Sequence, residues 1–204
     1  MSDIALLSQD DIRQALALRS ADPYISPYRE AFTPGEPRPA AVLLPLLRQN
    51  GDWRLLFIRR SVIDGDHHSG QVAFPGGRQD PEDHSPEDAA LREAREEIGL
   101  PAGGVQLLGR LEELITITNY QVTPVVGEIE WPQALNPAPS EVQRVFSIPL
   151  VWLADAANRE VQMRSLPDDP ELHPVIFFKE YYGELLWGAS ARITLSFLEA
   201  LGLA

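Results

Sequence analysis

Short apolar segments separated by turn-forming residues recur along this chain, and they predict a series of β-strands. Residues 40–47 and 53–59 are rich in aliphatic side chains, and Asn50-Gly51 between them is typical of a tight hairpin. Pro45 cannot donate a backbone hydrogen bond, so it predicts an edge position or a bulge in the first of these strands. Further strands are expected at residues 71–74, 105–111, 121–129, 160–163 and 175–182.

Three main helices are predicted by a wider spacing of apolar residues and by the residues at their ends, and a further short helix is expected after Leu150, reaching Ala157. The first covers residues 8–19 and begins after Ser8, which is suited to cap it. The second covers residues 86–98 with Ser85 as its cap, and the third begins near Ala189. Mixed strands with one strong central helix and one helix at the end indicate an α/β, or layered α+β, domain.

The central helix carries both an apolar stripe and a group of carboxylates. Leu91, Ala94 and Ile98 are spaced to form its buried stripe. Three acids lie off this stripe, where we expect them to face solvent or a cleft: Glu93, Glu96 and Glu97. Carboxylates at positions i, i+3 and i+4 share a helix face and repel one another, at roughly 0.2–0.5 kcal/mol per pair. Because a sharp Pro-Gly-Gly turn is expected just before this helix, we predict a site for a hard divalent cation, which prefers oxygen ligands.

A salt-bridged surface helix is the alternative interpretation of the same pattern. In that case Arg92 pairs with Glu96, four residues later, and the acids face solvent without binding a cation. The surrounding sequence favours the cation site. An apolar strand, the turn at residues 75–77, an acidic loop and the carboxylate helix follow one another without interruption.

Composition narrows the class of protein further. The chain has 204 residues, of which 44% are hydrophobic and 23% charged, enough for one globular domain with a full core. Its formal net charge of −13 argues against nucleic acid as a partner, although a metal site would still admit a small phosphorylated ligand. The absence of cysteine excludes disulfides, thiolate zinc sites and a cysteine nucleophile. Neither a signal peptide nor a membrane-spanning apolar run is evident, so we expect a cytoplasmic protein with no membrane partner.

Residues 92–100, Arg-Glu-Ala-Arg-Glu-Glu-Ile-Gly-Leu, resemble one half of the signature of the Nudix hydrolases at every position. The other half, a glycine and a glutamate upstream, departs from the family pattern. Gly77 precedes Arg92 by 15 residues where 14 are expected, which places Asp83 at the glutamate position. Gly76 and Glu82 are the alternative pair and require a longer spacer.

The resemblance implies a mixed β-sheet sandwiched between helices. The Nudix domain is expected at residues 37–204, including the C-terminal helix, and residues 1–36 are expected to form an N-terminal helix and a proline-rich arm. Flanking segments are similar to the coenzyme A diphosphatase branch of the family. These are residues 56–61, 70–77, 120–127 and 186–193.

This branch implies hydrolysis of a diphosphate bond in coenzyme A or a derivative, to adenosine 3′,5′-bisphosphate and 4′-phosphopantetheine. Two features differ from its signature. The second arginine is missing, and the loop between Arg60 and Gly70 is one residue longer. Two alternatives therefore stay open. One is hydrolysis of another nucleoside diphosphate derivative, such as ADP-ribose or a nucleotide sugar, and the other is a non-catalytic nucleotide-binding module.

The family resemblance also implies roles for individual residues. Mg²⁺ or Mn²⁺ would be held by Glu93 and Glu97, with Glu96 completing the set or accepting a proton from the attacking water. Arg92 would orient a glutamate through a charge-assisted hydrogen bond. Glu141 is a candidate additional base or metal ligand, and the alternative is that it is an ordinary acid at the start of a helix.

Three further positions are expected to contact a small-molecule nucleotide substrate. Gly76 and Gly77 lack side chains, which allows close approach of the backbone to a metal or phosphate. Arg60 can grip a phosphate with two hydrogen bonds, or it is simply a charge at a strand end. His67 and His68 precede the glycines in a loop and are weaker candidates for substrate contact. The oligomeric state is left open by the sequence.

Overall fold

The computed structural model describes residues 4–18, 35–62, 69–166 and 169–204. It contains each predicted helix and strand, most of them with shifted ends, and it adds strands at residues 76–78, 114–115 and 142–149 that the sequence did not predict. The helices are η1 (Ile4–Leu6), α1 (Gln9–Ala17), α2 (Pro86–Ile98), η3 (Ala102–Gly104), α3 (Leu150–Ala154), η4 (Ala156–Asn158) and α4 (Gly188–Ala200). The strands are β1 (Arg38–Gln49), β2 (Asp52–Arg60), β3 (Val72–Ala73), β4 (Gly76–Arg78), β5 (Val105–Arg110), β6 (Leu114–Ile115), β7 (Tyr120–Ile129), β8 (Val142–Pro149), β9 (Arg159–Leu166) and β10 (Asp169–Phe178). Most of the proline-rich arm and both loop histidines, His67 and His68, lie outside the described residues.

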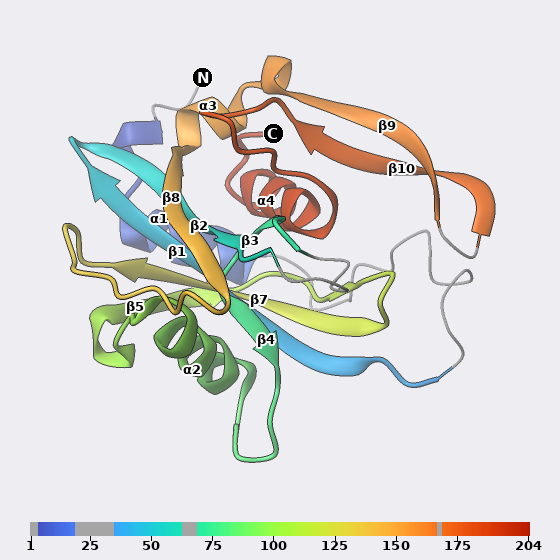
Figure 1. The fold of residues 1–204 in the computed structure, drawn as a ribbon. Helices are drawn as coiled ribbons and strands as arrows, with labels where there is room; N and C mark the ends of the chain where they lie inside the picture. The colour runs from blue at the N-terminus through green and yellow to red at the C-terminus, as the bar shows by residue number, and fades with distance from the viewer. Residues whose placement is uncertain (1–3, 19–34, 63–68, 167–168) are drawn as a thin grey trace.

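A mixed β-sheet forms the centre of the domain (Figure 1). Its main path runs β3-β2-β1-β7-β5, with β4 paired to β1, β6 to β7 and β8 to β2. β1 runs antiparallel to β2 and parallel to β7, so the sheet is mixed, as expected. β9 and β10 form a separate two-stranded sheet that extends from this body (Figure 1).

β1 is an interior strand, so the edge position predicted from Pro45 is wrong. The ladder with β4 covers Ala40 to Val42, and the ladder with β2 begins only at Leu46. Between them, the Leu43 N–H donates to the carbonyl of Pro75, on the side of β1 that faces those two strands. Because hydrogen-bonding direction alternates along a strand, the nitrogen of Pro45 faces the same gap. The proline is therefore accommodated where neither neighbouring ladder requires its N–H.

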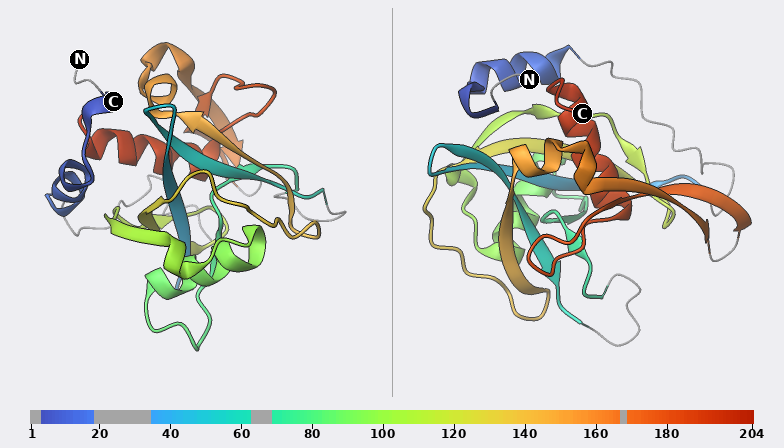
Figure 2. Two further views of the ribbon diagram at one scale, coloured as in Figure 1. Left: turned by 90° about the vertical axis from the view of Figure 1, so that its left-hand side faces the viewer. Right: turned by 90° about the horizontal axis from the view of Figure 1, so that it is seen from above.

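Two hydrophobic cores lie on opposite faces of the sheet, and alternate residues of the same strands supply them. On one face, Leu44 and Phe57 pack in a cluster that includes residues of α1 and α4. On the other face, Leu43 and Ile58 pack with the apolar side of α2. Figure 2 shows α2 on one side of the sheet and α1 and α4 on the other. This arrangement confirms the predicted sheet between helical layers.

The ends of α2 are those predicted from its capping residues. The Ser85 hydroxyl accepts a hydrogen bond from the backbone N–H of Asp88, and Gly99 ends the helix with a φ of 69°. The buried stripe is shifted from the predicted one. Its apolar members are the three alanines 89, 90 and 94 together with Ile98, whereas Leu91 is only half-buried. Small alanine side chains let the helix backbone approach the sheet closely, so they and not Leu91 face it.

The glycines at residues 76 and 77 form part of a strand, which corrects the predicted Pro-Gly-Gly turn. The chain bends at Pro75, and Gly76 and Gly77 then pair with Val42 and Ala41 of β1. Gly76 has a φ of +156°, and a Cβ there would lie 2.4 Å from the carbonyl oxygen of Ala41. Only glycine fits at this position.

No helix among the described residues combines the length and the apolarity that crossing a membrane requires.

Replacing Gly76 by alanine should destabilise the fold, because the new Cβ would clash with the β1 backbone and φ would become strained. We expect a loss on the order of 1–3 kcal/mol in the free energy of unfolding, measured by urea denaturation. Gly103→Ala is the matched control, since nothing lies within 4 Å of a Cβ at that position. Equal stability of the two variants would contradict this account of Gly76.

Candidate active site

Arg92 is the centre of an ion-pair network that ties α2 to the loop before it. Its Nε and Nη2 atoms donate to the two carboxylate oxygens of Asp83 at 3.1 and 2.9 Å. Nη1 donates to Glu93 at 2.9 Å and to Glu96 at 3.1 Å, and Nη2 also reaches the carbonyl of Arg78 at 2.9 Å. The predicted pairing of Arg92 with Glu96 is therefore present, together with stronger contacts to the loop and to Glu93.

The carboxylate that pairs with Arg92 is Asp83 and not Glu82, the other candidate for the signature position. The Asp83 side chain is 6% exposed, whereas Glu82 is exposed. The hydrogen bonds from Arg92 lower the pKa of Asp83 below its ordinary value, which keeps it charged. A tight turn accommodates the extra residue of the loop, because the Asp83 N–H donates to the Asp80 carbonyl at 3.0 Å.

Glu93 lies against the backbone of β4. A Cβ on Gly77 would come within 2.6 Å of the Glu93 carboxylate, so the missing side chain of this glycine makes room for the acid. Burial raises the pKa of Glu93, and the charges of Glu96 and Glu141 raise it further, while Arg92 acts in the opposite direction. Glu93 is thus held near β4 in surroundings that disfavour its charge.

Glu97 is buried, which corrects the prediction that it lies off the buried face of α2. It is 2% exposed, and its carboxylate accepts a hydrogen bond from the Gly76 N–H at 2.9 Å. Burial raises the pKa of Glu97 to about 7, despite this hydrogen bond. The negative charges of Glu93 and Glu141 also raise it, whereas Arg60 lowers it. Glu97 therefore lies buried between α2 and β4.

Glu141 and Arg60 approach these acids from the ends of two paired strands. β2 ends at Arg60, β8 begins at Val142, and the Ser61 N–H donates to the Glu141 carbonyl at 2.9 Å. The negative charge of Glu141 contributes to the raised pKa of both Glu93 and Glu97. Glu141 precedes a strand, so the alternative of an acid at a helix start is wrong.

These residues form a set of oxygen donors accompanied by two arginines, Arg92 beside Glu93 and Arg60 acting on Glu97. Glu93 and Glu97 form its buried part, whereas Glu96 is exposed on the outer side of α2. Among the residues that the structure describes, no three acidic or histidine side chains already lie in a metal-holding arrangement. The donor chemistry still suits a hard divalent cation, because burial raises the pKa of both Glu93 and Glu97 and neighbouring negative charges raise it further, and a bound cation would offset both effects.

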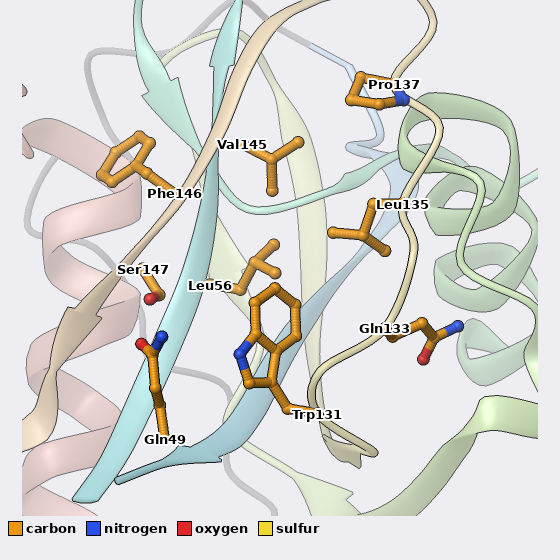
Figure 3. Close-up of a pocket in the computed structure, with 9 residues that line it drawn as sticks. All are labelled: Gln49, Leu56, Trp131, Gln133, Leu135, Pro137, Val145, Phe146 and Ser147. Carbon is orange, nitrogen blue, oxygen red and sulfur yellow. The ribbon is translucent and has the colours of Figure 1, made fainter.

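A cavity of about 350 Å³ lies elsewhere on the α2 side of the sheet, between the strands and the loop after β7 (Figure 3). Leu56 and Val145 point from the strands toward Trp131 and Leu135 of that loop (Figure 3). The remaining lining residues are Gln49, Gln133, Pro137, Phe146 and Ser147. Among the residues that the structure describes, those lining this cavity are uncharged.

Comparison with known proteins agrees with the strand, loop and carboxylate helix described above. A NUDIX domain model matches residues 36–179. The chain belongs to the Nudix hydrolase family. This confirms the family inferred from residues 92–100, and membership implies a hydrolase that acts on pyrophosphate bonds.

The uncharacterized Nudix hydrolase NudL of Photorhabdus laumondii is 39% identical over 159 residues, which cover 76% of this chain and 81% of that protein. The uncharacterized Nudix hydrolase NudL of Pectobacterium atrosepticum is 40% identical over 156 residues, covering 76% of this chain and 79% of that protein. Among solved structures, the Nudix hydrolase RenU of M. smegmatis is 27% identical, with a TM-score of 0.49. The match covers 59% of this chain and 76% of that chain.

The Asp83–Arg92 pair should support both stability and activity of this Nudix domain. Asp83→Ala removes the bidentate partner of Arg92, and we expect a loss of about 1–3 kcal/mol in unfolding free energy together with lower diphosphatase activity. Glu82→Ala is the matched control and should change neither, because Glu82 is exposed. If Glu82→Ala instead had the larger effect, the assignment of the signature position to Asp83 would be wrong.

Stability of the metal-free protein should fall with rising pH because of Glu97. Its folded pKa of about 7 lies above its ordinary value of 4.5, so between these pH values the folded state retains a proton that the unfolded state has released. The free energy of unfolding then falls across this interval, by up to roughly 3 kcal/mol from this group.

Glu97→Gln removes this titration and should flatten the profile between pH 5 and pH 8. Urea denaturation in the presence of a chelator measures the effect, with the exposed Glu82→Gln as the control. Parallel profiles for Glu97→Gln and the unsubstituted protein would show that burial does not raise the pKa of Glu97.

Proposed function

We propose that this Nudix protein hydrolyses the diphosphate bond of coenzyme A or a derivative, giving adenosine 3′,5′-bisphosphate and 4′-phosphopantetheine. The observation that carries a hydrolytic function is the placement of the Glu93 and Glu97 carboxylates against the glycines of β4, with Arg60 and Glu141 at the neighbouring ends of β2 and β8. The substrate is supported by the resemblance of the flanking segments to the coenzyme A diphosphatase branch.

Mg²⁺ or Mn²⁺ would be held by Glu93 and Glu97, with Glu96 as a further ligand. When bound, such a cation supplies charge neutralisation to a diphosphate and makes water more acidic. The protein's own contribution is to hold the two ligands in place. Gly76 does so through its N–H, and Arg92 does so through its hydrogen bond to Glu93.

Proton transfer from the attacking water falls to an acid beside the ligands. Glu141 is one candidate, because it is exposed just before β8 and its charge acts on both Glu93 and Glu97. Glu96 is the other candidate, and Arg92 holds it on the outer side of the helix. Arg60, beside Glu97, is suited to bind a phosphate of the substrate, and Gly76 and Gly77 leave space for its close approach.

A panel of substrates distinguishes coenzyme A hydrolysis from the two alternatives, which are hydrolysis of another nucleoside diphosphate derivative and nucleotide binding without catalysis. The protein is incubated with Mg²⁺ or Mn²⁺ and coenzyme A, acyl-coenzyme A, ADP-ribose, NADH or dinucleoside polyphosphates, and the products are resolved. Release of adenosine 3′,5′-bisphosphate from coenzyme A, with little turnover of the others, supports the proposal. Preferred turnover of ADP-ribose would indicate a different Nudix substrate, and inactivity on every compound would indicate a nucleotide-binding module.

Glu97→Gln should lower turnover at least about 100-fold, because the variant loses a negative charge at the cation site. Arg95→Gln is the matched control on the same helix, since Arg95 is exposed and should be dispensable. Steady-state rates at saturating Mg²⁺ measure both. A loss of less than threefold for Glu97→Gln would remove Glu97 from the metal site.

A further inference from the structure

A second charged cluster lies on the other face of the same strand ends. Glu184 accepts hydrogen bonds from Arg59 of β2 at 3.2 Å and from Arg144 of β8 at 3.1 Å, one on each carboxylate oxygen. Glu184 is only 3% exposed, whereas the side chains of Arg59 and Arg144 are 37% and 53% exposed. The acid is therefore sealed beneath two arginines that still face solvent in part.

The segment that carries Glu184 is built to hold this carboxylate in place. Tyr181 and Glu184 exchange backbone hydrogen bonds across a two-residue turn, at 3.0 and 3.1 Å. Tyr182 and Gly183 between them have φ values of 50° and 81°, as this kind of tight turn requires. Since a rigid turn presents the acid, the two arginines are fixed relative to each other and not left as independent flexible charges.

The cluster carries a net positive charge. Two guanidinium groups and one carboxylate leave one positive charge, in a protein whose formal net charge is −13. Each guanidinium has five N–H donors, and Glu184 takes one nitrogen from each. A fixed pair of arginines with donors to spare suits a phosphate, which accepts several hydrogen bonds at once.

The position of the cluster relates it to the proposed reaction site. Arg59 and Arg60 are the last two residues of β2, and Arg144 lies opposite Arg59 in the register with β8. Arg60 acts on Glu97 on the α2 side, whereas Arg59 reaches Glu184. The register also shifts between Arg59 and Arg60, an irregularity that redirects side chains at strand ends. β2 ends and β8 begins at this edge of the sheet, the rim, so Arg59 and Arg60 stand next to each other there.

We propose that Arg59 and Arg144 bind a phosphate monoester of the nucleotide substrate, and that Glu184 is the positioning residue that holds the two arginines. This inference rests on the proposed function, in which the diphosphate lies on the Arg60 side of the rim. A phosphate monoester on the ribose is a separate dianion a short distance from the diphosphate. In coenzyme A this group is the 3′-phosphate, so the cluster selects coenzyme A over the same molecule without that phosphate.

Kinetics with coenzyme A and dephospho-coenzyme A test this selection, since the two substrates differ only in the 3′-phosphate. We expect kcat/KM of the unsubstituted protein to favour coenzyme A by about tenfold or more. In Arg144→Gln this preference should fall toward one through a higher KM for coenzyme A, with kcat/KM for dephospho-coenzyme A within about twofold. Arg144→Lys should restore part of the preference, because the charge returns.

Two further variants separate binding from structural support. Glu184→Gln should also reduce the preference for coenzyme A, whereas a merely structural role would lower the rates on both substrates equally. Arg54→Gln is the matched control. Arg54 bridges the same two strands at their other end through Ser147, and its loss should leave the preference unchanged.

Binding of the isolated phosphate-bearing half of the substrate gives a second readout. Calorimetry should show that adenosine 3′,5′-bisphosphate binds the unsubstituted protein more tightly than AMP does, and that Arg144→Gln abolishes the difference. An unchanged preference in both assays for Arg144→Gln would overturn the inference. If the unsubstituted protein hydrolyses neither substrate, the proposed function fails, and the calorimetric comparison alone then decides whether this cluster binds a phosphate monoester.

Discussion

The contact between the buried Glu97 carboxylate and the Gly76 N–H is the constraint on which this site depends. It requires α2 to lie close to the sheet, which the small residues Ala90 and Ala94 permit. It also requires β4 to lie directly against β1, which only a glycine at residue 76 allows. The packing of the domain and the position of its most buried acid therefore have a common cause.

Burying a carboxylate is costly unless hydrogen bonds or opposite charges compensate for it. Here the compensation is partial. One backbone N–H and the charge of Arg60 favour the ionised form of Glu97, but its pKa still rises to about 7. Asp83 shows the opposite balance, because Arg92 holds both of its oxygens and lowers its pKa. Asp83 thus has a structural partner in Arg92. The negative charge of Glu97 is only partly compensated, and a bound cation would stabilise it.

Features fixed by neighbouring residues could be predicted from the sequence. The limits of α2 follow from Ser85 and Gly99, and the β1–β2 hairpin follows from Asn50-Gly51, because capping and turn chemistry act within a few residues. The family could also be predicted, since residues 92–100 carry its signature contiguously.

Features fixed by tertiary packing could not be predicted in this way. Helix periodicity predicts Leu91 in the core and Glu97 outside it. In the structure the alanines of α2 pack against the sheet, so the buried face of the helix includes Glu97 and not Leu91. Pro45 suggested an edge strand because its own sequence gives no sign that two ladders stop on either side of it. The choice between Asp83 and Glu82 likewise depended on which side chain the folded loop turns toward Arg92.

Substrate specificity also depends on tertiary packing, because two charged groups meet where β2 ends. Arg59 and Arg60 are adjacent in sequence, yet they serve opposite faces of the sheet, and Glu184, which holds Arg59, lies 125 residues further along the chain. The sequence Arg59-Arg60 does not reveal that the two side chains serve opposite faces, because Arg59 meets Glu184 only when the turn from Tyr181 to Glu184 packs on the sheet. Since both faces meet where β2 ends, one strand terminus can contribute Arg60 to the reacting diphosphate and Arg59 to a second phosphate. Substitutions in the turn from Tyr181 to Glu184 can then alter the preference among substrates without disturbing the acids that the proposed reaction requires.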